Sequence, residues 1–214
     1  MTRRTLFSLC LLSAFACKPR DASPHSPQAA KSEPVASVPD SFVVALTTSR
    51  GPVTLVVHRD WAPLGAERFY RLVQESFFDG ARFFRVVKGF VVQFGLPADP
   101  RVGRAWVSRA IADDPVRHSN RRGTLVFASA GPNSRTTQLF INLADNPRLD
   151  TFGRVGFPPI GVVTDGMAAV DALNGVYGET PSQDAIQLYG NAYLERNYPR
   201  LDYIQTARVA REWR

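Results

Sequence analysis

Residues 83–95 read FFRVVKGFVVQFG and contain one arginine and one glutamine within two short apolar runs. A Lys-Gly pair separates the runs, which predicts two strands joined by a tight turn. Because side chains alternate between the two faces of a strand, Gln93 is expected on the same face as Val91, with Phe90 on the opposite face. The guanidinium of Arg85 and an amide among so many apolar side chains suggest a groove for one neutral polar ligand.

The hairpin alone also fits an alternative, an edge hairpin whose Arg85 and Gln93 simply face water. Residues 123–143, GTLVFASAGPNSRTTQLFINL, read as a strand, a Gly-Pro-Asn-Ser turn and a second strand that begins near Gln138. One cation in register with two amides favours the groove over the solvent-facing hairpin.

Together the two stretches resemble the signature of the cyclophilin-type peptidyl-prolyl cis/trans isomerases. In that family the hairpin reads F-x-R-V-x-x-x-F-x-x-Q and the later segment A-x-A-G-P-N-x-x-x-x-Q-x-F, and both patterns occur here. The run DDPV at 113–116, followed by SN and GT, resembles the bacterial and plastid members. The resemblance implies a mainly β fold, a closed antiparallel β-barrel capped by helices, over about residues 42–211. It also implies isomerisation of X-Pro bonds in proline-containing polypeptide clients, with no cofactor and no metal.

The resemblance also assigns roles to individual residues. Arg85 matches the family's catalytic arginine, Gln93 a substrate-facing amide and Phe90 a pocket phenylalanine, and these three form the expected catalytic group. The expected substrate-binding residues are Val91, Ala128, Ser129, Ala130, Gln138, Phe140, Leu149 and Phe157. Without the polar residues in register, the phenylalanines and the leucine would read equally well as ordinary core.

Several positions depart from the family pattern. Ser129 stands where many members have Asn, and Val91 replaces a common Met, which narrows the pocket without making it polar. Arg148 occupies the place of a Trp in the eukaryotic members, so tight binding of the drug cyclosporin is not expected. Phe157 falls at the position of the usual pocket His. Bacterial members commonly lack both residues, so the departures affect the expected rate and ligand preference rather than the activity.

The chemistry that the resemblance implies needs no covalent step. Rotation about an X-Pro bond is opposed by about 18–20 kcal/mol because the planar amide delocalises the nitrogen lone pair. A catalyst has only to stabilise the twisted amide, and Arg85 suits this role because a guanidinium stays protonated and donates in a fixed fork. The alternative is a non-catalytic proline-peptide-binding or chaperone module on the same fold, which would bind such peptides without accelerating their exchange.

The N-terminal region reads as an export signal followed by a tether. A double arginine precedes an apolar run that ends in a small-x-small site, so residues 1–16 are expected to be a signal peptide. Cys17 follows directly and resembles the acylated cysteine of bacterial lipoproteins, with plain secretion as the alternative. Residues 17–40, rich in Pro, Ser and Ala, predict a disordered or polyproline tether before an isomerase domain at 41–214. The expected location is the cell envelope, lipid-anchored and facing the periplasm, or else secreted or free in the periplasm.

Composition excludes several other classes of function. The net charge of +7 falls to about +5 without the signal, and the arginines are scattered rather than clustered, which argues against nucleic-acid binding. Apart from Cys17 the mature chain has no cysteine, which excludes a disulfide, a thiol nucleophile and a thiolate metal site. Hydrolase and zinc-protease motifs are absent from the sequence. Asp113 and Asp114 are expected to cap turns and pair with arginine, and the protein is expected to be a monomer.

The remaining elements follow from periodicity and turn residues. Further strands are expected at 42–48, 53–58, 157–163 and 203–209, helices at 64–76, 166–174 and 186–196, and a long irregular passage at 96–122.

Overall fold

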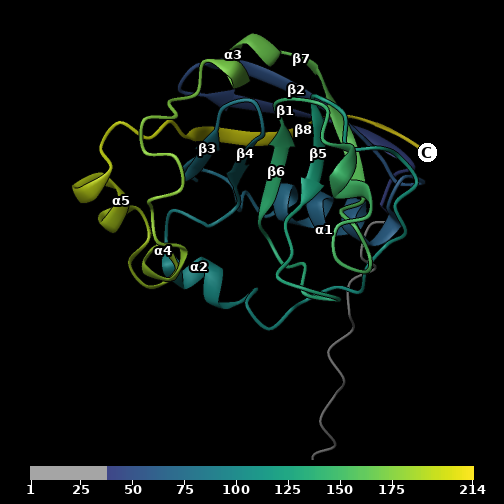
Figure 1. The fold of residues 1–214 in the computed structure, drawn as a ribbon, viewed down its shortest axis with the longest axis horizontal. Helices are drawn as coiled ribbons and strands as arrows, with labels where there is room; N and C mark the ends of the chain where they lie inside the picture. Colours follow the sequence, from purple (N-terminus) through teal and green to yellow (C-terminus); the bar gives the residue numbers. More distant parts are fainter. Residues whose placement is uncertain (1–37) are drawn as a thin grey trace, which may run out of the picture. The chain divides into compact units, whose positions relative to one another are not determined.

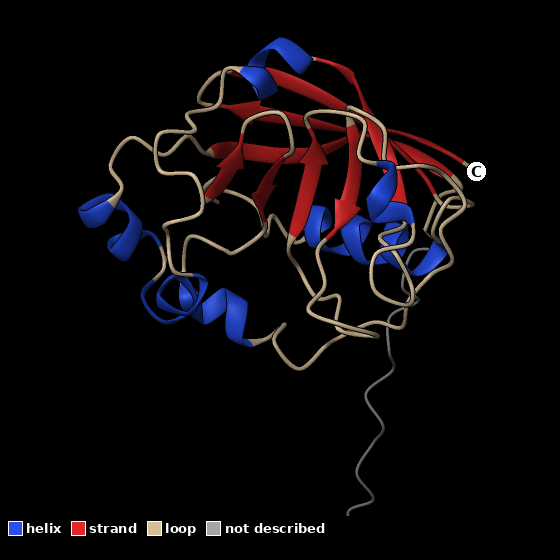
Figure 2. Ribbon diagram, in the orientation of Figure 1, coloured by secondary structure: helices blue, strands red, loops and turns tan. Residues whose placement is uncertain are grey.

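The computed structural model describes residues 38–214, and its centre is an eight-stranded sheet in the order β3-β4-β6-β5-β7-β2-β1-β8 (Figure 1). All of its strand pairs are antiparallel. The strands are β1 Ser41–Thr48, β2 Gly51–His58, β3 Arg85–Val87, β4 Val91–Phe94, β5 Thr124–Phe127, β6 Leu139–Asn142, β7 Pro159–Asp165 and β8 Ile204–Trp213. The helices are α1 Pro63–Gln74, α2 Pro100–Arg104, α3 Met167–Asp171, α4 Gln183–Tyr189 and α5 Asn191–Asn197, with a 3-10 helix η1 at Pro147–Asp150 (Figure 2).

The two edges of the sheet meet where the chain enters β3 and β8. Arg82 and Tyr203 form an antiparallel bridge there. Beside it, the N–H of Phe83 donates to the carbonyl of Asp202 at 2.9 Å. These bonds satisfy backbone groups that an open sheet edge would leave unpaired. The expected mainly β barrel with helices around it is therefore confirmed.

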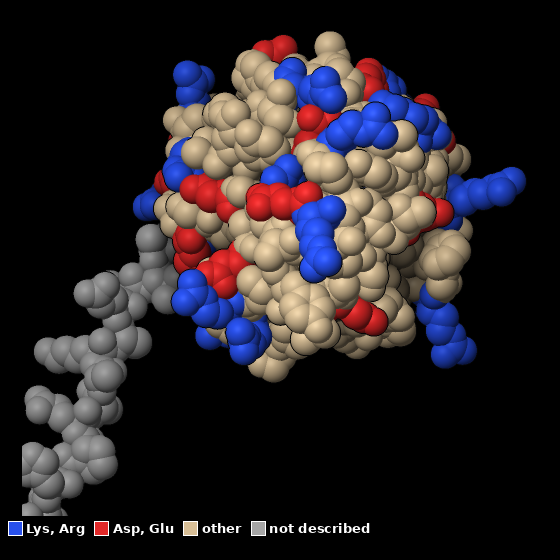
Figure 3. All heavy atoms as spheres, turned by 90° about the vertical axis from the view of Figure 1, so that its left-hand side faces the viewer, with Lys and Arg blue, Asp and Glu red and all other residues tan. Residues whose placement is uncertain are grey.

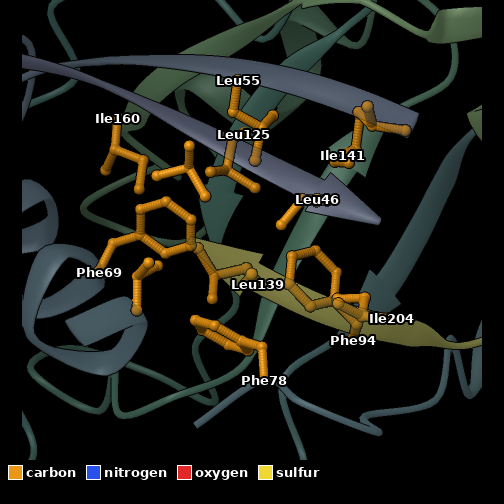
Figure 4. Packing of buried hydrophobic residues seen from close by; sticks show 14 of the residues in the cluster. Leu46, Leu55, Phe69, Phe78, Phe94, Leu125, Leu139, Ile141, Ile160 and Ile204 are labelled. Carbon is orange, nitrogen blue, oxygen red and sulfur yellow. The ribbon is translucent and has the colours of Figure 1, made fainter. Parts of the chain in front are cut away.

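The core fills the inside of this curved sheet. In β1 every second residue is buried, as the alternating sequence predicts, and Val44 lies opposite Leu55 of β2. Helix α1 covers one end of the core with apolar residues at helical spacing, among them the fully buried Phe69 and Leu72. Figure 4 shows Phe69 facing the barrel leucines, including Leu125 of β5. The expectation that this helix plugs the barrel is confirmed.

The C-terminal region departs from the expected single helix at 186–196. Two helices, α4 and α5, meet there at Gly190, whose φ is +59°. A Cβ at this position would overlap the Ala98 carbonyl, so the site requires glycine and the helix breaks. The passage at 96–122 is also less irregular than expected, because Asp99 accepts a hydrogen bond from the N–H of Arg101 at 2.8 Å and caps the short helix α2.

Charged side chains are interspersed on the face seen in Figure 3, where basic groups are separated by acidic and uncharged ones over much of the surface. Several arginines bond to a carboxylate, such as Arg208 with Asp79 at 2.6 Å and Arg82 with Glu195 at 2.9 Å. Exposed pairs of this kind contribute little to stability.

The N-terminal expectations fall mostly outside the described residues. The signal at 1–16, Cys17 and the tether as far as residue 37 belong to that part of the chain. Val38, the first described residue, packs against the core. Among residues 38–214, none of the helices combines the length and the apolar character that crossing a bilayer requires.

Candidate active site

One cleft of about 520 Å³ opens between the β3–β4 hairpin, the segment after β5 and the loop that contains η1. Every residue that the sequence assigned to catalysis or substrate binding lines it. The lining residues from that set are Arg85, Phe90, Val91, Gln93, Ala128, Ser129, Ala130, Gln138, Phe140, Leu149 and Phe157. The structure thus brings together side chains from segments that lie far apart in the sequence.

The polar side of the cleft follows from strand register. Arg85 of β3 lies opposite Gln93 of β4, and its Nη1 donates to Gln93 Oε1 across 3.4 Å. Gln93 Nε2 in turn donates to Oε1 of Gln138 at 2.8 Å. The Arg85 contact lies near the upper limit of hydrogen-bond length, so Nη1 has capacity to bind another acceptor. The three side chains form a line of donors and acceptors along one wall.

Phe90 corrects one detail of the predicted hairpin. The alternation placed it opposite Val91 and Gln93, but the turn extends through residue 90 and β4 begins only at Val91. Outside the strand the alternation no longer applies, and the Phe90 ring lies in the cleft with the guanidinium carbon of Arg85 5.7 Å from its centroid. This distance fits a cation–π contact.

The cleft also has an apolar wall. Val91, Val126 and Phe140 form a buried cluster, against which Phe90, Ala128, Leu149 and Phe157 pack. The rings of Phe140 and Phe157 meet edge to face at 5.8 Å. Phe157, which the sequence placed where a histidine is usual, adds a further aromatic ring to this wall. Arg148, which was expected where the eukaryotic members have a tryptophan, is exposed and is not among the lining residues.

A polar network behind the cleft fixes the loop that carries Leu149 and Phe157. Asn120 Nδ2 donates to the Phe157 carbonyl and to Oδ1 of Asp150, both at 2.8 Å, and the hydroxyl of Ser119 donates to the other Asp150 oxygen at 2.6 Å. Burial raises the pKa of Asp150, but these hydrogen bonds outweigh it and hold that pKa below its ordinary value. An ionised Asp150 thus anchors the apolar wall.

Asp113 and Asp114 act structurally, as expected. Asp114 accepts hydrogen bonds from the N–H groups of Leu64 and Gly65 at the start of α1, at 3.0 and 2.9 Å, and pairs with Arg135 at 2.9 Å. Neither aspartate lines the cleft. Within residues 38–214 no group of three or more His, Cys, Asp or Glu side chains could hold a metal ion.

Some residues of the site were not found from the sequence. The cleft is also lined by Ser134, Thr136, Phe152 and Gln183. Ser134 and Thr136 lie inside the Gly-Pro-Asn segment, whose pattern could have indicated them. Gln183 begins α4, and Glu179, which bonds to Nε of Arg85 at 2.6 Å, precedes that helix. No sequence pattern connects either residue with the hairpin.

The arrangement supports binding and polarisation rather than bond cleavage. Among the described residues that line the cleft there is no His, Cys, Lys or carboxylate to activate a hydroxyl nucleophile. What the lining offers is one permanent cation, three side-chain amides (Gln93, Gln138 and Gln183) and an aromatic hollow. This combination suits a neutral ligand with a backbone carbonyl and a compact apolar ring.

Comparisons with known proteins agree on one family. A family model described as cyclophilin-type peptidyl-prolyl cis-trans isomerase/CLD matches residues 43–190. Peptidyl-prolyl cis-trans isomerase A of Dickeya dadantii is 35% identical over 150 residues, covering 68% of this chain and 78% of that protein. Peptidyl-prolyl cis-trans isomerase ppi1 of Schizosaccharomyces pombe is 37% identical over 119 residues, covering 52% of this chain and 77% of that protein.

The fold is also shared with solved structures. A crystal structure of a cyclophilin-type isomerase of Cryptosporidium parvum, in the presence of the dipeptide Ala-Pro, matches with a TM-score of 0.60 and 20% identity. The match covers 79% of this chain and 99% of that chain.

Proposed function

This chain belongs to the cyclophilin-type peptidyl-prolyl cis-trans isomerase family, and from that premise we propose that Arg85, Gln93 and Phe90 carry the reaction. The activity is that of the family, cis/trans isomerisation of X-Pro peptide bonds. The observation that supports these roles is the cross-strand register, which sets Arg85 opposite Gln93 at the mouth of an aromatic hollow.

Arg85 has the right donor for the twisted amide. When an X-Pro bond leaves planarity, the lone pair localises on the proline nitrogen and becomes a hydrogen-bond acceptor. A charged hydrogen bond to it contributes about 1.5–3 kcal/mol, or roughly ten- to a hundredfold in rate. The Arg85 side chain is only 24% exposed, and this partial shielding from water strengthens the contact.

The rest of the cleft holds the substrate. The wall of Val91, Phe140, Leu149 and Phe157 takes the proline ring, while Gln93 and Gln138 bind substrate carbonyls. Ala128, Ser129 and Ala130 follow directly after β5, where an extended peptide can run alongside them. Fixing the ring and the carbonyl while the nitrogen meets Arg85 stabilises the twisted state over the planar one.

The mechanism is tested by proline-limited refolding and by peptide isomerisation. Arg85→Ala should lower kcat/KM by ten- to a hundredfold, whereas Arg208→Ala, which removes a paired arginine away from the cleft, should leave it unchanged. Full activity in Arg85→Ala would refute the assigned role. A shift titration with a proline peptide, run beside the rate assay, separates catalysis from a binding module, because the module would bind without a rate effect.

The cellular role that we propose is folding of exported proteins in the cell envelope. It is supported by the sequence alone, through the signal-like residues 1–16 and the position of Cys17. Lipid on Cys17 would hold a monomeric enzyme at a membrane surface by way of the tether. Mass spectrometry of the mature N-terminus tests this proposal: two or more acyl chains on Cys17 support it, and a terminus with unmodified Cys17 contradicts it.

A further inference from the structure

A turn after α3 brings the C-terminal region of the chain against the catalytic hairpin. Strand β3 stands at one end of the sheet order, so within the described residues one of its edges has no strand partner. On that edge the N–H of Val86 donates to the Gly178 carbonyl at 3.2 Å. This bond sets Glu179 beside Arg85, the neighbour of Val86 in β3.

Glu179 binds one edge of the Arg85 guanidinium. Its Oε1 accepts from Nε at 2.6 Å and also contacts Nη2. Nη1, on the other side of the group, points to Gln93 at 3.4 Å, and the Phe90 ring lies 5.7 Å from the guanidinium carbon. The planar fork is therefore held from three directions, with Nη1 directed along the polar wall of the cleft.

The turn that carries Glu179 is itself firmly packed. Tyr177 and Tyr198 meet edge to face at 5.1 Å, and the Tyr198 hydroxyl donates to the carbonyl of Thr180 at 3.1 Å. These rings pack against a second core cluster made of Phe84, Leu96, Ile186, Leu194 and Leu201. Because both sides of the turn are anchored, the carboxylate is presented from a fixed backbone.

We infer that Glu179 is a positioning residue, which fixes the rotamer of Arg85 so that Nη1 faces the substrate nitrogen. The inference rests on the proposed role of Arg85. An arginine without this partner would distribute over several rotamers, and only some of them direct a donor into the cleft. The expected effect is on kcat, because the contact to the twisted nitrogen is made in the transition state. If the Glu179 carboxylate instead competed with the substrate for Arg85, its removal would raise the activity rather than lower it.

The test compares two carboxylates of the same region. Glu179→Gln keeps the size of the side chain and removes its charge. Glu195→Gln is the matched control, because the Glu195 side chain is as exposed as that of Glu179 (60% against 61%) and pairs with Arg82, which does not line the cleft. Glu179→Gln should lower kcat about five- to tenfold with KM within twofold of wild type. Glu179→Asp, which keeps the charge on a shorter side chain, should recover part of the loss, and Glu195→Gln should match wild type.

A double variant shows whether Glu179 acts through Arg85. In an Arg85→Ala background, Glu179→Gln should have no further effect on kcat. The inference would be overturned if Glu179→Gln lowered kcat equally in the Arg85→Ala background. It would also be overturned if Glu179→Gln alone left kcat unchanged or raised it. If Arg85→Ala itself keeps full activity, the proposed catalytic role fails instead, so the two failures are distinguishable.

Nuclear magnetic resonance provides a readout that does not depend on activity. The Nε–H signal of Arg85 should be sharp and shifted downfield in the wild-type protein and in Glu195→Gln, because a carboxylate binds it. In Glu179→Gln the signal should broaden or move toward the position of a free arginine. An Arg85 signal that is the same in both variants would also overturn the inference.

Discussion

Replacing Asp114 by asparagine should destabilise the protein strongly, because Asp114 neutralises a buried cation. Arg135 is 1% exposed, and its closest carboxylate is that of Asp114, itself 4% exposed, at 2.9 Å. Among the described residues, Nε and Nη1 of Arg135 already have no hydrogen-bond partner. The substitution would remove the negative charge and would turn an amide N–H₂ toward one of the helix N–H groups that now donate to the Asp114 carboxylate.

The magnitude follows from the loss of one partner in a buried pair. Breaking such a pair costs about 3–5 kcal/mol. Asp113 also lies 3.5 Å from Arg135 and compensates part of the charge, so the lower end, about 3 kcal/mol, is expected. For a domain of this size that corresponds to a fall of roughly 6–12 °C in Tm.

Urea and thermal unfolding of the purified protein measure this change. Glu67→Gln is the control, since it breaks an exposed pair with Arg71 on the same helix α1 and should change stability by less than about 0.5 kcal/mol. Adding Arg135→Met to Asp114→Asn should restore part of the lost stability, because the uncompensated charge is then gone. If the Tm of Asp114→Asn is indistinguishable from that of wild type, the account of this buried pair is wrong.

Three further predictions address the backbone, pH and the apolar wall. Gly95→Ala, where a Cβ would overlap the Thr137 carbonyl, should lose more stability in thermal melts than Gly89→Ala. At Gly89 an added Cβ would meet no described atom within 4 Å beyond the neighbouring residues, so only the positive φ costs about 1–2 kcal/mol; equal losses would contradict this. Burial raises the pKa of Asp150, but its hydrogen bonds lower that pKa by more, so the net pKa in the folded protein is below the ordinary value of about 3.9. The ionised Asp150 therefore stabilises the fold above about pH 3.9, and this contribution is lost as the pH falls through the pKa of the folded state. Unfolding followed from neutral into strongly acidic pH should show this loss in wild type and not in Asp150→Asn, and parallel curves would refute it. Phe157→Ala should raise KM for proline peptides about tenfold with little change in kcat, as steady-state kinetics would show, because it removes ring contacts from the hollow; an unchanged KM would exclude Phe157 from binding.

Much of the site could be predicted because the two stretches that carry the family resemblance are long and ordered. The resemblance supplied the roles, including those of Leu149 and Phe157 outside the stretches, and local patterns added which strand residues share a face. The two signature stretches each contain a strand and its neighbours, so alternation and turn residues determine which side chains share a face. Cross-strand pairing then brings Arg85, Gln93 and Phe140 to one cleft, as the register shows. The error at Phe90 arose at a strand end, where the two-residue period stops and the turn sets the direction of the side chain.

The remainder depends on packing between distant segments. Gly190 reads as an ordinary helical residue with a weak propensity until the Ala98 carbonyl occupies the space of its Cβ. From the sequence, Glu179 is interpreted as a solvent-exposed carboxylate. Its contact with Arg85 depends on the hydrogen bond between the Gly178 carbonyl and Val86 of β3. Neither contact leaves a periodic pattern in the sequence, because each depends on a partner about a hundred residues away.

The pairing of β1 with β8 determines when this enzyme can finish folding. The two strands lie far apart in the sequence, so during synthesis one edge of β1 has no strand partner, and can pair with other chains, until β8 has emerged. An enzyme that accelerates slow folding steps therefore completes its own sheet late. Truncation within residues 204–213 should impair folding more than the solvent exposure of those residues would suggest.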